Sequence, residues 1–210
     1  MLNLQNAARP MMEEIHHFHD ILIMILLPIA SSILLVIFML IRRVMSHRIL
    51  VDDQKVETYW TFMPCVILLV IALPSLRLLY LYDAHNEPAL CVKALGHQWY
   101  WQYDYPSLPS YNSYLRRDYR LLRRDNHLIL PLGVGEVLVS AADVLHSWTV
   151  PSIAVKADAV PGRVNKLTLR LKRPGMFFGQ CSEICGRNHR FMPITLESYI
   201  FSLTAALKVV

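Results

Sequence analysis

Charge is scarce in the N-terminal third of this chain. No ionisable side chain occurs from Ile21 to Ile41, and a second uncharged run extends from Thr58 to Leu76. About 21 residues at ~1.5 Å each give a helix of ~31 Å, which matches a hydrocarbon core of about 30 Å. Together with 54% hydrophobic residues and a mean hydropathy of +0.33, these runs exclude an ordinary soluble domain. They predict a transmembrane hairpin over residues 1–82, with helices over about 21–41 and 58–79.

Other common signals are absent as well. The chain shows no internal repeat, no low-complexity segment and no alternation of strands and helices of the kind that builds a parallel sheet. The first apolar run lacks the small-residue cleavage site of a secretory signal, and the acidic, arginine-poor start is unlike a transit peptide. These absences argue against repeat architectures, against α/β folds and against a cleaved leader.

Basic residues distinguish the two sides of the hairpin. The loop over residues 42–57 carries four lysines and arginines, whereas the first 20 residues carry only Arg9. Because basic loops stay on the cytoplasmic or matrix side, we expect this loop to face that compartment. Both termini and the domain that follows the hairpin are then expected on the opposite side.

The remainder of the chain, residues 83–210, is predicted to form an all-β domain. Short β-branched and aromatic stretches such as LIL, EVLVS, SWTV and KLTLRL are separated by proline and glycine turn signals. This spacing favours a sandwich or a small barrel.

An aromatic segment, HQWYWQYDY, opens this domain. Strict alternation on one strand would place its odd-numbered residues on a single face, namely His97, Trp99, Trp101, Tyr103 and Tyr105. The segment is interpretable as a half-buried aromatic strand. Alternatively, an exposed tryptophan within it serves as a contact or an electron port.

Soft donor atoms gather in the stretch GQCSEICGRNHRFMP. It contains Cys181, Cys185, His189 and Met192. On a helix the first and last of these would be separated by about 16 Å of rise, too far for one metal site. The flanking glycines and Pro193 instead suit a loop between strands, where chain reversal brings the four side chains together.

The donor types indicate which metal would bind. Thiolate and thioether together favour copper over a structural zinc. A mononuclear blue-copper site uses a single cysteine, so the second cysteine suits two coppers that share bridging thiolates. The missing imidazole must come from another strand, and His146 in DVLHSWTVPS is the candidate. A disulfide between Cys181 and Cys185 is the structural alternative.

Four motifs carry a family resemblance. GHQWYWQYDY, DVLHSWTVPS, KADAVPGRVN and GQCSEICGRNHRFMP follow the two-helix hairpin in this order. The sequence resembles subunit II of cytochrome c oxidase, of the mitochondrially encoded type. The resemblance implies a cupredoxin-like Greek-key barrel or sandwich that carries the binuclear copper centre CuA. It also implies a subunit that accepts electrons from cytochrome c and passes them to haem in subunit I, where oxygen is reduced and protons are pumped.

The resemblance also implies a set of metal ligands. The implied copper ligands are the bridging thiolates of Cys181 and Cys185, the imidazoles of His146 and His189, the weak thioether of Met192 and the backbone carbonyl of Glu183. The carboxylate of Glu183 is implied to bind a magnesium ion shared with subunit I, because a hard carboxylate suits magnesium better than copper.

Further roles concern electron and proton transfer. Trp99 matches the family's residue where electrons arrive, and Glu57 matches the acid at the mouth of a proton pathway. Docking of a basic cytochrome c normally uses several carboxylates after the aromatic motif, but YPSLPSYNSYLRRDYRLLRRD is poor in acids. Asp104, Asp143 and Asp158 remain as docking candidates. The resemblance places the chain in the mitochondrial inner membrane, with the copper domain and both termini in the intermembrane space and no nucleic-acid partner.

Three alternatives come from other classes. The first is a membrane-tethered copper chaperone or thiol reductase with a C-x-x-x-C site, although such proteins usually alternate strands and helices. The second is a nitrous-oxide reductase domain with the same copper centre, whose other copper site needs more than the nine histidines present. The third is a structural subunit in which the two cysteines form a disulfide.

Overall fold

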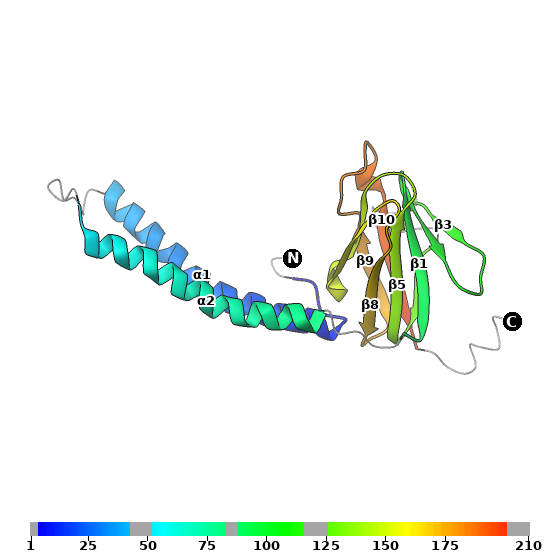
Figure 1. Cartoon of the computed structure of the whole chain (residues 1–210), viewed down its shortest axis with the longest axis horizontal. Coiled ribbons are helices and arrows are strands. Elements are labelled where there is room, and N and C mark those ends of the chain that lie inside the picture. The colour runs from blue at the N-terminus through cyan, green and yellow to red at the C-terminus, as the bar shows by residue number, and fades with distance from the viewer. Residues whose placement is uncertain (1–3, 43–51, 83–87, 116–125, 201–210) are drawn as a thin grey trace. The chain divides into compact units, whose positions relative to one another are not determined.

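The computed structural model describes residues 4–42, 52–82, 88–115 and 126–200. The chain divides into two compact units, a helical unit from Glu14 to Ala84 and a β unit that combines Met1–Glu13 with His85–Val210. Figure 1 shows the long helices and the β-sandwich. Two N-terminal apolar helices followed by a β-sandwich confirm the predicted fold class.

Two long helices, α1 (Pro10–Ile41) and α2 (Gln54–Tyr82), are apolar and long enough to cross a membrane. Proline at the first position of α1 costs no intrahelical hydrogen bond. Asp53 caps α2, since its Oδ1 accepts the backbone N–H groups of Lys55 at 3.1 Å and Val56 at 3.3 Å. Both helices extend beyond the predicted ranges, because uncharged runs mark the part that suits hydrocarbon rather than the whole helix.

The described residues of the β unit form ten strands. They are β1 (Leu90–His97), β2 (Tyr100–Asp104), β3 (Tyr111–Ser113), β4 (Leu128–Pro131), β5 (Gly133–Ala141), β6 (His146–Val150), β7 (Val155–Ala159), β8 (Asn165–Leu171), β9 (Gly175–Gln180) and β10 (Pro193–Tyr199). One sheet has the order β3-β2-β1-β5-β8, a second has β4-β10-β9, and β6 pairs with β7. The pairs β1 with β5 and β4 with β10 are parallel, and the others are antiparallel.

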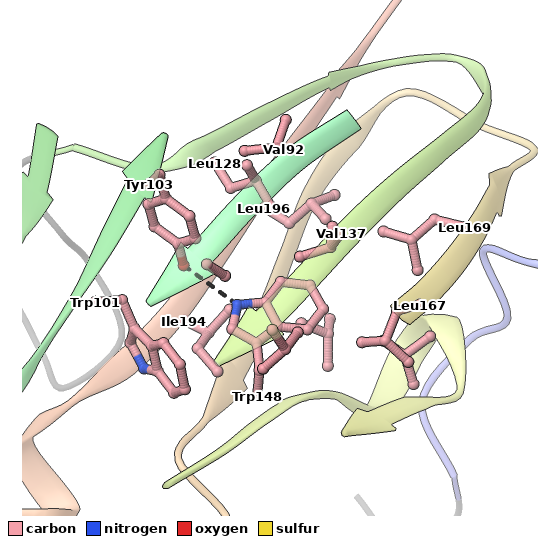
Figure 2. Close-up of a cluster of buried hydrophobic side chains, with 14 of the residues drawn as sticks. Val92, Trp101, Tyr103, Leu128, Val137, Trp148, Leu167, Leu169, Ile194 and Leu196 are labelled. Carbon is pink, nitrogen blue, oxygen red and sulfur yellow. Dashed lines mark hydrogen bonds between the residues drawn. The ribbon is translucent and has the colours of Figure 1, made fainter. Parts of the chain in front are cut away.

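Aromatic side chains fill the centre of the β unit. Trp101, Tyr103 and Trp148 are fully buried, and the indole N–H of Trp148 donates to the Tyr103 hydroxyl at 3.3 Å. Aliphatic side chains from both sheets surround them (Figure 2). Because large aromatic rings contribute most of the apolar area of a small core, these three residues dominate the packing that holds the sheets together.

The N-terminal segment belongs to the β unit. The backbone N–H of Ala8 donates to the carbonyl of Ser152 at 2.9 Å, and the N–H of Lys172 donates to the carbonyl of Ala8 at 3.0 Å. Ala8, Met11 and Met12 are buried. The sequence-based division between residues 82 and 83 assigned this segment to the hairpin, because such long-range backbone pairing leaves no local signal.

The aromatic segment is not one strand, so that prediction was wrong. Strand β1 ends at His97 and β2 begins at Tyr100, with these two residues paired across a tight turn formed by Gln98 and Trp99. The turn contains no glycine, proline or asparagine, the residues from which a tight turn is predicted in a sequence. Tertiary hydrogen bonds hold it instead, and the Trp99 side chain therefore leaves the face that Trp101 occupies.

Gly179 allows β9 to approach β6. A Cβ atom at this position would lie 1.8 Å from the carbonyl oxygen of Thr149, so no side chain fits without moving a backbone. We predict that Gly179→Ala destabilises the β unit by about 3 kcal/mol, measured by denaturant unfolding of the purified chain with tryptophan fluorescence.

The matched control is Gly135→Ala. There the added Cβ would meet Leu130 side-chain carbons at 3.6 and 3.7 Å, which is ordinary contact. A cost below about 1 kcal/mol is expected. Equal stability of the two variants would contradict the role assigned to Gly179.

Candidate metal centre

The donor-rich stretch forms the loop between β9 and β10, as the sequence predicts. The backbone N–H of Cys181 donates to the Met192 carbonyl at 3.3 Å, which closes the loop at its base. The next N–H, that of Ser182, donates to the carbonyl of Ser147 on β6 at 3.1 Å. The loop therefore begins beside the strand that carries His146.

Five predicted donors meet at this place. The Nδ1 atom of His146 lies 3.9 Å from the Sγ atom of Cys181. The Sγ atom of Cys185 lies 3.5 Å from Nδ1 of His189 and 3.3 Å from Sδ of Met192. The candidate ligand atoms of His146, Cys181 and Cys185 lie within 4.8 Å of one another, and these three residues are buried.

The sixth predicted donor also faces the cluster. The thiol of Cys181 donates to the backbone carbonyl of Glu183 at 3.4 Å. Both Cys181 and Cys185 are free thiols in the structure. The loop thus presents two thiols, one imidazole, a thioether and a carbonyl beside the imidazole of His146 on β6.

The two thiols differ in acidity. Burial opposes ionisation of Cys181, but hydrogen bonds to His146 and to the backbone at Glu183 outweigh it and lower the thiol pKa to about 7. Burial and the neighbouring Cys181 thiolate raise the pKa of Cys185 to about 12. The thiols therefore ionise in sequence, because one thiolate disfavours a second negative charge beside it.

The Gln98–Trp99 turn rests on the same loop. The indole N–H of Trp99 donates to the carbonyl of Cys185 at 3.2 Å, and the Gln98 side-chain amide donates to the same oxygen at 2.8 Å. A Cβ atom at Gly186 would lie 3.2 Å from both of these side chains. The half-buried Trp99 ring is thus hydrogen-bonded directly to a cysteine of the cluster.

Sequence reasoning missed two residues of the site. Gln98 holds the turn against Cys185, and Gly96 leaves room for the imidazole of His146. A Cβ atom at Gly96 would lie 2.8 Å from the His146 ring carbon Cδ2. In the sequence, the only signal for Gly96 and Gln98 is that both lie in GHQWYW, just before its run of three aromatic residues.

The three predicted docking acids lie in different settings. Asp104, at the end of β2, accepts a hydrogen bond from the Gln102 amide at 2.9 Å. Asp158 is exposed on β7, whereas Asp143 contacts the imidazole of His146. Burial tends to raise the pKa of Asp143, but hydrogen bonds from His146 and from the backbone at Val144 and Gln98 lower it overall.

Exposed apolar side chains adjoin the ligands in the sequence. Ile184, between the two cysteines, is 79% exposed. Val144 and Leu145, directly before His146, are also exposed. Three solvent-facing aliphatic residues next to the ligands give the site an apolar rim, a composition that is typical of contact surfaces.

Glu57 belongs to the helical unit. It lies exposed in the first turn of α2, in a shallow hollow that Thr58, Thr61, Phe62 and Cys65 also line. The Glu57 carboxylate is therefore exposed at the N-terminal end of α2. This end of the helix adjoins the basic loop over residues 42–57.

The fold and the site together define a class of protein. Soft donors collected on one loop of a β-sandwich, behind two apolar helices, describe a membrane-anchored domain with a cupredoxin-like fold. Residues 90–199 match the family model for the periplasmic domain of cytochrome c oxidase subunit II, and residues 1–78 match that for its transmembrane domain. The chain belongs to the cytochrome c oxidase subunit II family, and it is a subunit of a membrane oxidoreductase complex.

Solved structures agree with this assignment. The periplasmic domain of subunit II of cytochrome oxidase (CoxB) from Bradyrhizobium japonicum is 40% identical, with a TM-score of 0.55 over 58% of this chain and 92% of that chain. A second is a mixed disulfide intermediate between a thioredoxin-like protein, TlpA, and subunit II of cytochrome c oxidase. It is 38% identical, with a TM-score of 0.53 over 60% of this chain and 92% of that chain.

The thiol acidities are testable on the metal-free chain. Because the pKa of Cys181 lies below its ordinary value of 9.0, its thiolate predominates above pH about 7 and disappears as the pH falls below that value. We predict that ultraviolet thiolate absorbance rises near pH 7 in the wild type. Cys181→Ser removes this step, and a step that persists in that variant would contradict the assignment.

Proposed function

We propose that this chain accepts electrons from cytochrome c at a binuclear copper centre and delivers them to haem in subunit I, for reduction of oxygen coupled to proton pumping. One observation carries the proposal. The donors of Cys181, Cys185, His146, His189 and Met192 converge, and the Trp99 indole is hydrogen-bonded to their loop.

The donor chemistry fits copper. Two thiols, two imidazole Nδ1 atoms and one thioether are soft or borderline ligands, and the carbonyl of Glu183 adds an oxygen. A pair of copper ions bound by these groups supplies a one-electron redox couple. The low pKa of Cys181 helps binding, because a thiolate rather than a thiol is the ligand.

The protein's own contribution is a rigid, largely buried set of ligands. His146 is fully buried at the start of β6, a backbone hydrogen bond holds Cys181 at the loop base, and the carbonyl of Cys185 accepts the side chains of Gln98 and Trp99. Side chains fixed in this way reorient little when the charge of a bound metal changes. A small reorganisation suits a site that relays electrons.

Trp99 is the proposed point of electron arrival. Its half-buried ring lies at the tip of the β1–β2 hairpin, and its N–H group contacts the carbonyl of Cys185. A haem protein that docks over this tip would reach the cluster through one hydrogen bond and one residue. The apolar rim of Val144, Leu145 and Ile184 offers that partner a contact surface beside the tip.

The remaining roles follow from the same proposal. The carbonyl of Glu183 faces Cys181, which leaves its carboxylate for a magnesium ion shared with subunit I. The exposed Glu57 would receive protons at the start of α2. The proposed location is the mitochondrial inner membrane. The basic loop supports an orientation with the helix–helix loop in the matrix and both termini with the copper domain in the intermembrane space.

Family membership favours an oxidase subunit over a copper chaperone or thiol reductase as the function of the chain itself. A thioredoxin-like protein is instead a proposed partner, since a relative forms a mixed disulfide with one. Such a partner would keep Cys181 and Cys185 reduced until the metal binds, because a disulfide cannot supply two thiolates.

Copper analysis tests the proposal directly. The purified complex that contains this chain is expected to hold two coppers in this subunit that share one unpaired electron, as seen by electron paramagnetic resonance. Cys185→Ser should lose the shared-electron signal, because one bridging thiolate is gone. Met192→Leu should keep both coppers and shift the potential, because a weak axial ligand tunes the metal rather than holding it.

Two outcomes would overturn the proposal. One is a single metal ion, or none, at the wild-type site. The other is a disulfide between Cys181 and Cys185 in the active complex. Loss of all copper in Met192→Leu would contradict the weak-ligand role of that residue alone.

The docking surface leads to a separate prediction. Because Asp143 is hydrogen-bonded within the site and the rim is apolar, few free carboxylates steer a basic partner. We predict that the association rate with cytochrome c falls less than about threefold between low and physiological ionic strength. Stopped-flow kinetics over a salt series measures this rate. A steep fall of the rate with added salt would contradict the prediction and indicate an acidic docking patch.

A further inference from the structure

His146 differs from the other candidate ligands because it lies outside the cysteine loop. It stands at the start of β6, its side chain is fully buried, and its Nδ1 atom lies 3.9 Å from Sγ of Cys181. The second torsion of a histidine side chain has only broad minima. Its Nε2 atom is hydrogen-bonded, but this atom lies close to the axis of that torsion, so the bond restrains the tilt of the ring only weakly. Packing must therefore fix the direction of Nδ1.

Two residues paired across β1 and β2 form a socket for this ring. Gly96 and Trp101 are partners in the antiparallel register and are buried on the same face of the sheet. A Cβ atom at Gly96 would lie 2.8 Å from Cδ2 of His146 and 3.0 Å from Cγ, so the imidazole packs directly on the Gly96 backbone. The Trp101 indole stands beside it, with ring centroids 5.9 Å apart and ring planes at 63°. The socket thus contacts the ring from below and from one side.

The choice of tryptophan at position 101 is not explained by core packing alone. Trp101 is fully buried, and its indole N–H has no hydrogen-bond partner among the described residues. The second fully buried tryptophan, Trp148, donates its N–H to the Tyr103 hydroxyl at 3.3 Å. A phenylalanine at 101 would fill much of the same space without an unpaired buried donor, which costs free energy. The larger ring of Trp101 is explained by its contact with His146.

We propose that Trp101 is a positioning residue, which together with Gly96 holds the imidazole plane of His146 so that Nδ1 stays directed at Cys181. The inference rests on the proposed function, because it takes His146 as a copper ligand. A ring held on two sides by apolar contacts does not have to reorient when the charge of a bound metal changes. Trp101 therefore acts on the metal only through His146.

Trp101→Phe in the complete oxidase complex tests the socket. The smaller ring leaves a gap beside His146, so we expect the imidazole to sample a wider range of tilts. Pulsed electron paramagnetic resonance should show a broadened or split nitrogen hyperfine coupling from one histidine. Copper affinity should fall about tenfold, with KM for cytochrome c unchanged. In the metal-free chain, the nuclear Overhauser contact between the His146 ring and the β protons of Cys181 should weaken.

The matched control is Trp148→Phe, which makes the same change at the second fully buried tryptophan. This variant loses the hydrogen bond to Tyr103, whereas Trp101→Phe removes a donor that is unpaired within the described residues. Trp148→Phe should therefore lower the denaturant midpoint more, as followed by the fluorescence of the remaining tryptophans. It should leave the hyperfine coupling and the Overhauser contact as they are in the wild type. The two variants thus rank in opposite orders for stability and for the geometry of His146.

Three results would overturn the proposal. The first is a Trp101→Phe variant with the wild-type coupling and Overhauser contact. The second is a Trp148→Phe variant that alters the site as strongly, since the effect would then come from a loosened core. The third is a Trp101→Phe variant that is less stable than Trp148→Phe or does not fold, because packing alone would then account for Trp101. A wild-type complex without the copper pair refutes the proposed function, whereas the Overhauser contact in the metal-free chain still decides the role of the socket.

Discussion

Close approach of two backbones is the constraint on which the metal centre depends. Strand β9 lies against β6 at Gly179, where a side chain would collide with the Thr149 carbonyl. This approach sets the start of the cysteine loop beside the strand that carries His146, and the Ser182 N–H completes the connection by pairing with Ser147. His146 lies beside the donors of the loop because these strands touch, and a shared metal would accept donors only within a few ångströms.

A layer of hydrogen bonds around the ligands gives the site its orientation. The carbonyl of Cys185 receives the Gln98 amide and the Trp99 indole, and the carboxylate of Asp143 receives His146 and the Gln98 backbone. These groups bind no metal themselves, but they determine which atom each ligand presents. Val144, Leu145 and Ile184, next to these residues in the sequence, are exposed apolar side chains.

Some predictions from the sequence succeeded because they rest on local chemistry. Uncharged runs revealed both helices, since about 20 consecutive uncharged, mostly apolar residues are what a helix needs to cross a bilayer. Turn residues and β-branched stretches located four of the ten described strands, β4, β5, β6 and β8. The spacing of Cys181, Cys185, His189 and Met192, together with the flanking glycines and Pro193, indicated a loop that collects its donors.

Other features needed the tertiary structure. The sequence by itself determined the element types, the soft donors and the family, because each is written in composition, spacing or motif. Only the folded chain decided that HQWYWQYDY turns at Gln98, that the N-terminal segment joins the β unit, and that Asp143 faces inward to His146. Asp143 and His146 are only three residues apart, but the turn at Gln98 and the N-terminal segment are held by hydrogen bonds to partners tens of residues away along the chain. Hydrogen bonds over such separations have no periodicity for local reasoning to detect.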